Sequence, residues 1–571
     1  MKKIKPQSCT HTGAASGIKR RSQLGRVLES LPAVLVVFLM GALFVGCEGS
    51  STTPEAASKS EKVLADREVV VAIYRDGAIE DLDAASYNGP HFLYKMIYEG
   101  LVEDEGQGRL RPILATSWDI SEDGRTYVFH LRKNVKFSDG TDFDAEAAVF
   151  NLKRWIGNDL YFALTSSQVE SLEALDKYTL KIVYKEAAYP ILTELTYPRP
   201  VRFLSPVSIT DDGDQPGGRF TGPVGTGPWM LESYIKEEEF TLIPNPHYWG
   251  QKPKVGRIRF KVVPDGQARV LALKSGEVDI VGGDLIGKIP LESLVELKKD
   301  GKLQVFTKGT LCSHFLAFNN DANLFDDKSL RLAINYAIDK KVVAESLFDN
   351  IGLAADGLYQ PDVPYANERN NFGYPGDKEK ARAILEQAGY VDGDGDGIRE
   401  KDGRKLEYSL LLSTGEFPEW KPLAEFIQSE LAAVGIKVNL NILDKNGYFE
   451  TTQKTRKFDL ALMRTASDSW MPHSSLLELY APLAGLNVAK VWTDPWLLAK
   501  VKDTLTTIDP VERQKKYDQL FGFASAEALV APLYYPVTAF TVNTEKIKNF
   551  EIGVNNYAPV EWEKLEIEVE K

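Results

Sequence analysis

Apolar residues recur at helical spacing between Ser329 and Val343. Positions three and four apart lie on the same face of a helix, so these residues form one apolar stripe. The stripe consists of Leu330, Ala333, Ile334, Ala337 and Ile338. We expect this helix to pack its stripe against a sheet.

A strand, a helix and a second strand follow one another between Leu406 and Leu440. Apolar residues alternate at both ends of this stretch, as in strands with one buried face. The intervening helix is expected from Pro422 to about Val434, and Gly435 ends it. The pattern predicts a βαβ unit within an α/β domain, whereas the N-terminal half of the chain is richer in strands.

The first fifty residues have the pattern of a targeting segment. Basic residues up to Arg26 precede an uncharged run from Leu31 to Gly46, and Cys47 follows. This is typical of a secretory signal peptide, residues 1–46, with a lipid-attachment cysteine, and the run is shorter than the roughly 20 residues that span a bilayer. Residues 47–66 are expected to be a flexible tether. We therefore expect an exported protein, lipid-anchored in the periplasm or on the outer face of the cytoplasmic membrane.

Composition excludes several classes of protein. The 571 residues include 68 basic and 81 acidic side chains, and the resulting net charge of −13 argues against nucleic-acid binding. The three cysteines, Cys9, Cys47 and Cys312, are too few for a disulfide framework or a cysteine-ligated metal site. Residues 282–288 have the spacing of a phosphate-binding loop, but Ile289 stands where a Ser or Thr is required, so we interpret the match as coincidence.

The exported part of the chain lacks the common catalytic signatures. It contains neither a Gly-x-Ser-x-Gly nucleophile elbow nor a His-Glu-x-x-His zinc helix. We therefore expect no enzymatic activity and no catalytic cofactor. An exported hydrolase whose catalytic pair is hidden in the sequence is the alternative.

Three stretches resemble the peptide/nickel/opine class of ABC-transporter substrate-binding proteins, extracellular solute-binding protein family 5. The first runs from Leu114 to Ala147 and includes Ser-Glu-Asp-Gly and Phe-Ser-Asp-Gly turns. The second includes Val-Gly-Thr-Gly-Pro-Trp, residues 224–229, and Asn-Pro-His-Tyr-Trp-Gly, residues 245–250. The third, Leu330 to Lys340, ends in Ala-Ile-Asn-Tyr-Ala-Ile-Asp-Lys.

The resemblance implies a fold and a role. The fold is α/β, a two-lobed type II periplasmic-binding architecture with an extra β-rich subdomain, hinged around a ligand cleft. One lobe would comprise residues 67–309 and 531–571, and the other residues 310–530. Such a protein captures a small solute by closure and delivers it to ABC permease subunits and their ATPase, and the family expectation is a monomer.

Within the family, the chain resembles the nickel-binding branch most. Its Pro-Arg-Pro-Val-Arg-Phe segment, residues 198–203, matches a stretch in which the first arginine, here Arg199, binds the carboxylates of a metal chelate. The same resemblance implies ligand contacts by Tyr87, His91, Trp470 and Tyr557. The expected ligand is therefore nickel, bound as a chelate or metallophore.

One position and one segment of the chain differ from the nickel-binding branch. Asp159 stands where that branch has a second arginine, and the segment from Leu476 to Trp492, which would carry its metal-contacting histidine, contains none. His91 could replace the missing imidazole. An opine, a dipeptide or an oligopeptide therefore stays open as the ligand.

A short acidic loop offers a candidate cation site. Asp392, Asp394 and Asp396 occupy positions 1, 3 and 5 and a glycine occupies position 6, as in calcium loops, but Gly403 stands where a bidentate glutamate belongs. Glu400 or Asp402 could close a shorter loop. We expect either a structural Ca²⁺ or an acidic surface turn.

Overall fold

The computed structural model describes residues 67–77, 82–85, 90–156, 168–198, 201–210, 218–320, 325–415, 417–465, 471–482 and 489–568. The chain forms two compact units, Met1–Ala56 and Ala57–Lys571, and every described residue belongs to the second. The expected signal peptide, Cys47 and the tether lie outside the described residues. Within the described part of the chain, no helix has the length and apolarity needed to cross a membrane.

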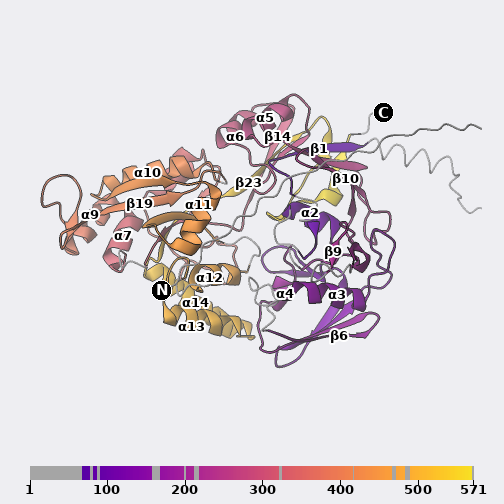
Figure 1. The fold of residues 1–571 in the computed structure, drawn as a ribbon. Helices are drawn as coiled ribbons and strands as arrows, with labels where there is room; N and C mark the ends of the chain where they lie inside the picture. Colours follow the sequence, from indigo (N-terminus) through magenta and orange to yellow (C-terminus); the bar gives the residue numbers. More distant parts are fainter. Residues whose placement is uncertain are drawn as a thin grey trace, which may run out of the picture. The chain divides into compact units, whose positions relative to one another are not determined.

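A seven-stranded sheet organises the first lobe, in the order β10-β11-β12-β1-β13-β23-β14. Its central strand β1 is almost wholly apolar and buried, which is typical of a strand covered on both faces. Alternate residues of β1 join two different cores: Val69, Val71 and Ile73 pack with α2, and Val70 and Ala72 pack with α5 and α6. In Figure 1 the yellow strand β23, from the C-terminal end of the chain, lies beside β14. The elements are β1 (Glu68–Ile73), β10 (Trp229–Ile235), β11 (Glu239–Pro244), β12 (Arg257–Val262), β13 (Ile280–Gly282), β14 (Leu303–Gly309), β23 (Val537–Asn543), α2 (His91–Ile97), α5 (Gly266–Lys274) and α6 (Leu291–Leu297).

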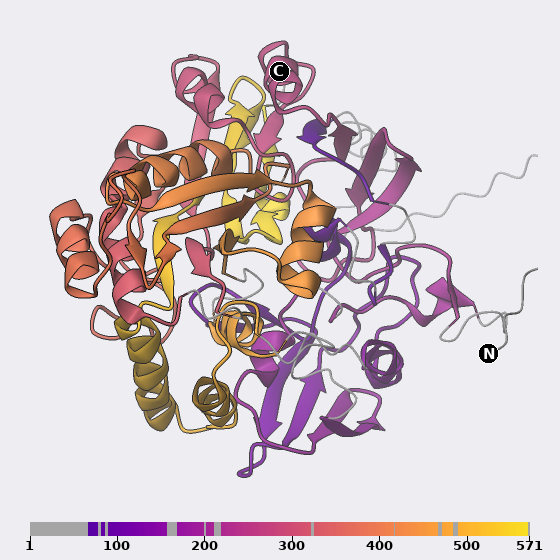
Figure 2. The same cartoon turned by 60° about the vertical axis from the view of Figure 1, so that its left-hand side comes forward.

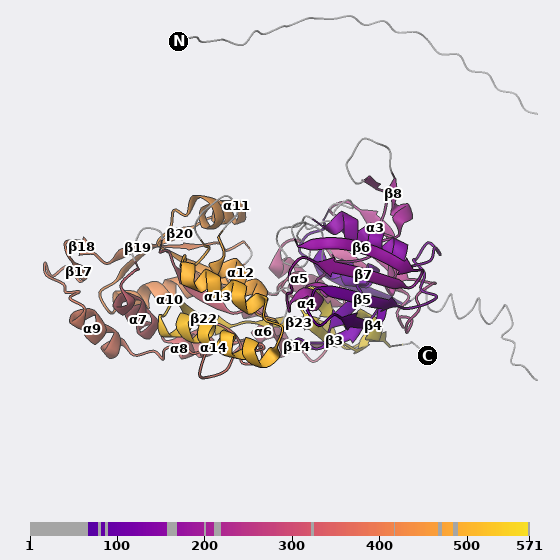
Figure 3. The same ribbon diagram turned by 90° about the horizontal axis from the view of Figure 1, so that it is seen from below.

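The β-rich subdomain expected from the first resemblance stretch is a four-stranded antiparallel sheet, in the order β4-β5-β7-β6 (Figure 3). Helix α3 packs on β6 and β7 and begins where the Asp144 side chain accepts a hydrogen bond from the Ala147 amide. Every second residue of β5 and β7 is buried, as an amphipathic strand requires. The elements are β4 (Ala115–Ile120), β5 (Thr126–Leu131), β6 (Val169–Asp176), β7 (Thr179–Tyr184) and α3 (Ala145–Trp155).

A six-stranded sheet organises the second lobe, in the order β16-β22-β15-β21-β19-β20. Strands β19 and β20 are parallel and joined through α10, which confirms the predicted βαβ unit; in Figure 2 this orange helix runs alongside the orange strands. The elements are β15 (His314–Phe318), β16 (Leu353–Ala354), β19 (Glu407–Leu412), β20 (Lys437–Ile442), β21 (Leu460–Arg464), β22 (Val530–Tyr535), α7 (Lys328–Ala337), α9 (Lys378–Gln387), α10 (Trp420–Ala432), α12 (His473–Tyr480), α13 (Pro495–Leu505) and α14 (Pro510–Ala526).

The predicted stripe helix is α7, and its apolar face is buried in the core of this lobe. It ends at Ala337, earlier than the pattern indicated, because Asp339 caps a separate helical turn by accepting hydrogen bonds from the Lys341 and Val342 amides. Helix α10 ends near the predicted stop, where Gly435 adopts the left-handed conformation at φ 86°.

Shorter helices and strands lie between these elements in the described part of the chain. They are β2 (Val102–Asp104), β3 (Leu110–Pro112), α4 (Ile191–Glu194), β8 (Ile209–Thr210), β9 (Arg219–Phe220), α8 (Lys340–Val342), β17 (Glu400–Lys401), β18 (Arg404–Lys405), α11 (Lys445–Glu450), β24 (Ile547–Asn549), β25 (Ile552–Asn555), β26 (Ala558–Val560) and β27 (Glu566–Ile567).

The chain passes between the two large sheets twice. The first crossing joins β14 to β15 and the second joins β22 to β23 at Pro536. The expected boundary at residue 531 falls inside β22, which pairs with the second sheet as far as Tyr535. The Thr310 amide donates to the Pro536 carbonyl at 3.2 Å, so the two crossing segments are bonded to each other.

A buried ion-pair cluster anchors the segment that carries the Pro-Arg-Pro-Val-Arg-Phe motif. The Arg202 guanidinium is fully buried and donates to Glu103 Oε1 at 2.9 Å and to the Thr196 carbonyl at 2.7 Å. Lys95 reaches the other oxygen of Glu103 at 2.7 Å. Burial alone would raise the pKa of Glu103, but Lys95 and Arg202 together lower it to about 2. The second arginine of the motif is therefore an internal anchor of the first lobe.

We expect Glu103→Gln to lower the free energy of unfolding by about 3 kcal/mol at pH 7, because it leaves buried cations without their carboxylate. A depressed pKa stabilises the fold above the ordinary value of 4.5, and the benefit is lost as pH falls toward about 2. The difference between wild type and variant in denaturant melts should therefore shrink over that interval.

The matched control is Glu105→Gln, since Glu105 pairs with Arg111 at 3.2 Å in an exposed position. This control should cost less than about 1 kcal/mol. Equal losses for the two variants, or a difference that does not change with pH, would contradict the anchoring role of Glu103.

Candidate ligand site between the lobes

A polar cluster joins the lobes next to the crossing segments. Lys288, which follows β13 in the first lobe, contacts Glu419 Oε1, at the start of α10 in the second lobe, at 2.5 Å. The Lys288 ammonium also lies 5.4 Å from the centre of the Phe417 ring. Burial alone would lower the pKa of Lys288, but Glu419 and Asp284 raise it above its ordinary value. The bridge is therefore an ion pair at neutral pH.

His314 supports this cluster as a neutral base. Trp420 Nε1, which can only donate, lies 2.7 Å from His314 Nδ1, so that nitrogen is an acceptor. The Tyr534 hydroxyl lies 2.9 Å from the same nitrogen and 3.4 Å from Glu419 Oε1. Burial, followed by the charges of Lys288 and Arg464, lowers the pKa of His314 well below its ordinary value. The imidazole therefore positions Trp420 and Tyr534 without adding charge.

A second contact joins the lobes through α4 and α12. The Tyr197 hydroxyl lies 2.9 Å from His473 Nε2, and the two rings are stacked with their centres 6.3 Å apart. Glu194 Oε1 lies 3.4 Å from the same nitrogen, and all three side chains are buried. This contact and the Lys288–Glu419 bridge are separate points of attachment between the lobes.

Most of the expected ligand residues lie outside the described residues. These are Arg199, Tyr87 and Trp470; His91 is the first residue of α2, but its side chain is not described. Asp159, the departure from the nickel branch, also lies outside the described residues. Their roles stay predictions.

Tyr557 is the one expected ligand residue whose side chain is described. It is buried in the turn between β25 and β26, where its amide donates to Asn555 Oδ1 at 3.0 Å. Its neighbour Asn556 hydrogen-bonds Asp284, whose pKa burial raises. Tyr557 is therefore the next residue in the chain after Asn556, which contacts the polar cluster around Lys288.

Most of the residues that join the lobes belong to no sequence motif. Lys288 ended a coincidental phosphate-loop pattern, and in the structure it bonds Glu419, which is 131 residues away. His314 and Glu419 belong to no motif. His473 and Tyr197 lie near expected ligand residues in the chain, His473 three positions after Trp470 and Tyr197 two positions before Arg199.

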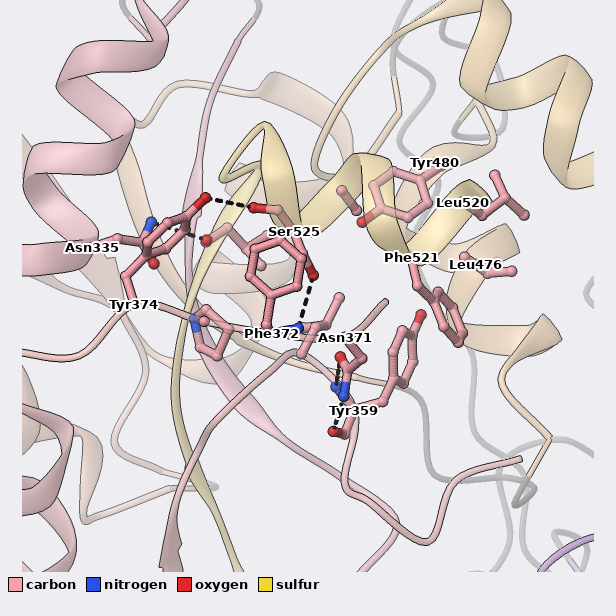
Figure 4. A pocket seen from close by; sticks show the side chains of 15 residues that line it. Asn335, Tyr359, Asn371, Phe372, Tyr374, Leu476, Tyr480, Leu520, Phe521 and Ser525 are labelled. Carbon is pink, nitrogen blue, oxygen red and sulfur yellow. Dashed lines mark hydrogen bonds between the residues drawn. The ribbon is translucent and has the colours of Figure 1, made fainter. Parts of the chain in front are cut away.

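A small cavity lies wholly within the second lobe, between α7, α12 and α14 (Figure 4). Its volume is about 20 Å³, and its lining includes Tyr359, Tyr480 and Phe521. The Tyr359 and Tyr480 hydroxyls and Asn335 Oδ1 are buried without a hydrogen-bond partner among the described residues. The space suits one or two water molecules and is too small for a chelate or a peptide.

The acidic loop brings three of its expected ligands together. Within the described part of the chain, Asp392, Asp394 and Glu400 place carboxylate oxygens within 4.8 Å of one another. Asp396 is not part of this group; Lys405 bonds both Asp394, at 2.7 Å, and Asp396, at 2.5 Å. Lys405 occupies carboxylate oxygens that a calcium ion would need and partly neutralises the acidic turn. Calcium binding stays a prediction.

Comparisons with known proteins identify the family. Residues 109–486 match the model of bacterial extracellular solute-binding proteins, family 5. The chain belongs to this family. It is a two-lobed solute-binding component of an ABC importer, and such proteins work with permease and ATPase subunits.

Several relatives differ in what their names say they bind. The nickel-binding periplasmic protein of Escherichia coli K12 is 32% identical over 83% of this chain and 88% of its own. A glutathione-binding protein of Pectobacterium atrosepticum is 27% identical over 87% of this chain and 96% of its own. Among solved structures, NikA from Brucella suis in complex with Fe(III)-EDTA matches with a TM-score of 0.80, at 28% identity over 88% of this chain and all of its own.

If the acidic loop binds calcium, about 10 mM CaCl₂ should raise the melting temperature by about 2 °C, since weak extracellular sites have a Kd of roughly 10⁻⁴ to 10⁻³ M. Asp392→Asn should abolish the increase. Differential scanning calorimetry against NaCl of equal ionic strength checks this. An equal melting temperature in both salts would leave the loop as an acidic surface turn.

Proposed function

We propose that the protein captures nickel as an organic chelate and delivers it to an ABC permease. The observation that carries this proposal is the 32% identity to a nickel-binding periplasmic protein over 83% of the chain. The structural match to a relative that holds Fe(III)-EDTA supports a chelated rather than a free metal. The protein acts by binding and release, without catalysis.

Arg199 is proposed to grip a carboxylate of the chelate. A guanidinium can bind a carboxylate through two parallel hydrogen bonds, which a carboxylate-rich chelate offers. In the chain Arg199 lies two residues after Tyr197 and three before the anchored Arg202. The described residues on both sides of Arg199 are held in place, Tyr197 by His473 of the other lobe and Arg202 by Glu103.

The remaining contacts are proposed to come from aromatic residues and one imidazole. Tyr87, Trp470 and Tyr557 would provide apolar walls, and His91 would supply a metal-binding nitrogen. Trp470 precedes His473 by three positions. The lobes therefore each contribute proposed ligand residues, as capture by closure requires.

The lipid anchor is proposed to be at Cys47. It would hold a monomeric receptor at the membrane through the tether of residues 47–66, close to the permease. This arrangement would keep the binding protein near its transporter after each release.

A peptide is the second candidate ligand. The 27% identity to a glutathione-binding protein over 87% of the chain favours it, because glutathione is a tripeptide with two carboxylates. Both ligand classes would use Arg199. The two ligand classes differ in whether the bound molecule contains a metal ion.

We expect the purified protein to bind Fe(III)-EDTA and nickel with L-histidine in calorimetric titrations, and to bind glutathione and dipeptides at least tenfold more weakly. Arg199→Ala should weaken chelate binding at least about tenfold, because it removes a charge-assisted bidentate contact. The matched control is Arg404→Ala, at an exposed position in β18. Tight glutathione binding without chelate binding would contradict the nickel proposal.

We expect His91→Ala to reduce the affinity for nickel with L-histidine more than the affinity for Fe(III)-EDTA, because the hexadentate chelator leaves the metal fewer open positions. Parallel titrations of the variant and the wild type check this. An unchanged affinity for both probes would remove His91 from the metal site.

A further inference from the structure

One segment of the first lobe reaches into the second lobe. The Tyr189 amide, in the loop between β7 and α4, donates to the Leu505 carbonyl at the end of α13 at 3.1 Å. Tyr189 also packs against the hydrophobic core of the second lobe. It is thus a first-lobe residue whose backbone and side chain both contact the other lobe.

The Tyr189 side chain lies in a socket of the second lobe. Its hydroxyl contacts the Tyr517 hydroxyl at 2.5 Å, and the Arg513 guanidinium lies 4.1 Å from the centre of its ring. The Tyr365 and His473 rings meet it edge to face, with centre separations of 6.3 and 6.1 Å. Aromatic and cation–π contacts of this kind are favourable in addition to the burial of apolar surface.

Three of the four socket residues, Tyr365, Arg513 and Tyr517, are held to one another by contacts within the second lobe. Tyr365 and Tyr517 stack with their ring centres 4.4 Å apart and an interplanar angle of 1°. Arg513 Nε donates to the Tyr365 hydroxyl at 2.8 Å, and its Nη1 donates to the Thr507 carbonyl at 2.9 Å. Because these contacts do not involve the first lobe, this part of the socket can persist when Tyr189 leaves it.

A second contact between the lobes lies close to the loop that carries Tyr189. Gly124, in the turn between β4 and β5, packs against Ile508 in the connection from α13 to α14: a Cβ built at Gly124 would lie 3.1 Å from the Ile508 side chain. Gly124 has a φ of 68°, so the turn needs glycine for its backbone as well as for this close approach. The first lobe therefore meets the second lobe at two loops, the turn between β4 and β5 and the loop between β7 and α4.

We propose that Tyr189 is a closure latch, an affinity-determining residue that stabilises the closed form without touching the ligand. A contact made only when the lobes are together increases the population of the closed form, and the apparent affinity rises in proportion to that population. The latch rests on the proposed function only in that closure retains the ligand. The contact itself, a tyrosine side chain in a socket of arginine and aromatic residues, is the same whichever ligand is bound.

Hydrogen exchange tests the latch without knowledge of the ligand. The amide at position 189 is protected by a carbonyl of the other lobe, so its exchange reports separation of the lobes. In Tyr189→Ala this amide should exchange at least tenfold faster than in the wild type. Peptides from β5, β7 and β15 should keep their protection, which shows that both lobes remain folded.

The matched control is Tyr127→Phe. The Tyr127 hydroxyl contacts the Ala188 carbonyl at 3.5 Å within the first lobe, so this variant disturbs the same loop without altering the socket. Tyr189→Phe, which loses only the contact with the Tyr517 hydroxyl, is the conservative variant should Tyr189→Ala fail to fold. We expect it to raise exchange at position 189 several-fold and the control to leave it unchanged.

Dissociation of Fe(III)-EDTA provides the functional measurement. Tyr189→Ala should release this probe about tenfold faster with little change in the association rate, because the latch acts after the ligand has entered. If the wild type does not bind the probe, the chelate proposal fails while the exchange measurement still decides the latch. A folded Tyr189 variant whose amide exchanges no faster than that of Tyr127→Phe would overturn the latch.

Discussion

The rest of the structure depends on the double passage of the chain between two sheets. Because the crossing segments are bonded to each other through Thr310 and Pro536, the lobes are tied together along one edge. Two bodies joined at one edge can separate at the opposite edge with small changes in a few backbone angles. This constraint makes a hinged captor out of two otherwise ordinary α/β lobes.

The contacts between the lobes are of two chemical kinds, one beside the crossing segments and the other at two loops of the first lobe. Next to the crossing segments the contact is charged, with Lys288 against Glu419 supported by the neutral His314. At the loops that carry Tyr189 and Gly124 the contact is largely aromatic and apolar. An ion pair loses hydration whenever it is buried, so its net gain is small, whereas aromatic burial is favourable. The contact at these two loops is therefore the part best able to stabilise closure.

Local patterns allowed much of the fold to be predicted. The stripe of α7 and the βαβ unit around α10 arise from spacings within about a dozen residues, and both are confirmed. The lobe boundary expected at residue 531 falls inside β22, which β23 follows almost directly in a run rich in apolar residues on both sides of Pro536. Nothing in such a run shows which strand pairs with which sheet.

The candidate site was less predictable for the same physical reason. Lys288 and Glu419 are 131 residues apart, and Tyr189 and Tyr517 are 328 apart, so no local spacing connects them. The motif at residues 198–203 contains two arginines that look equivalent in sequence. The structure shows a role for one of them, since Arg202 is bonded to Glu103 inside the first lobe. The family resemblance assigned the ligand role to Arg199, which the local pattern alone could not do.

Native mass spectrometry of the protein purified gently after export, with elemental analysis of the same sample, tests the central claim most directly. The account predicts a bound adduct that contains nickel together with an organic chelator. A metal-free series of adducts with peptide masses would contradict it, and the kinship with nickel-binding proteins would then reflect ancestry without shared function.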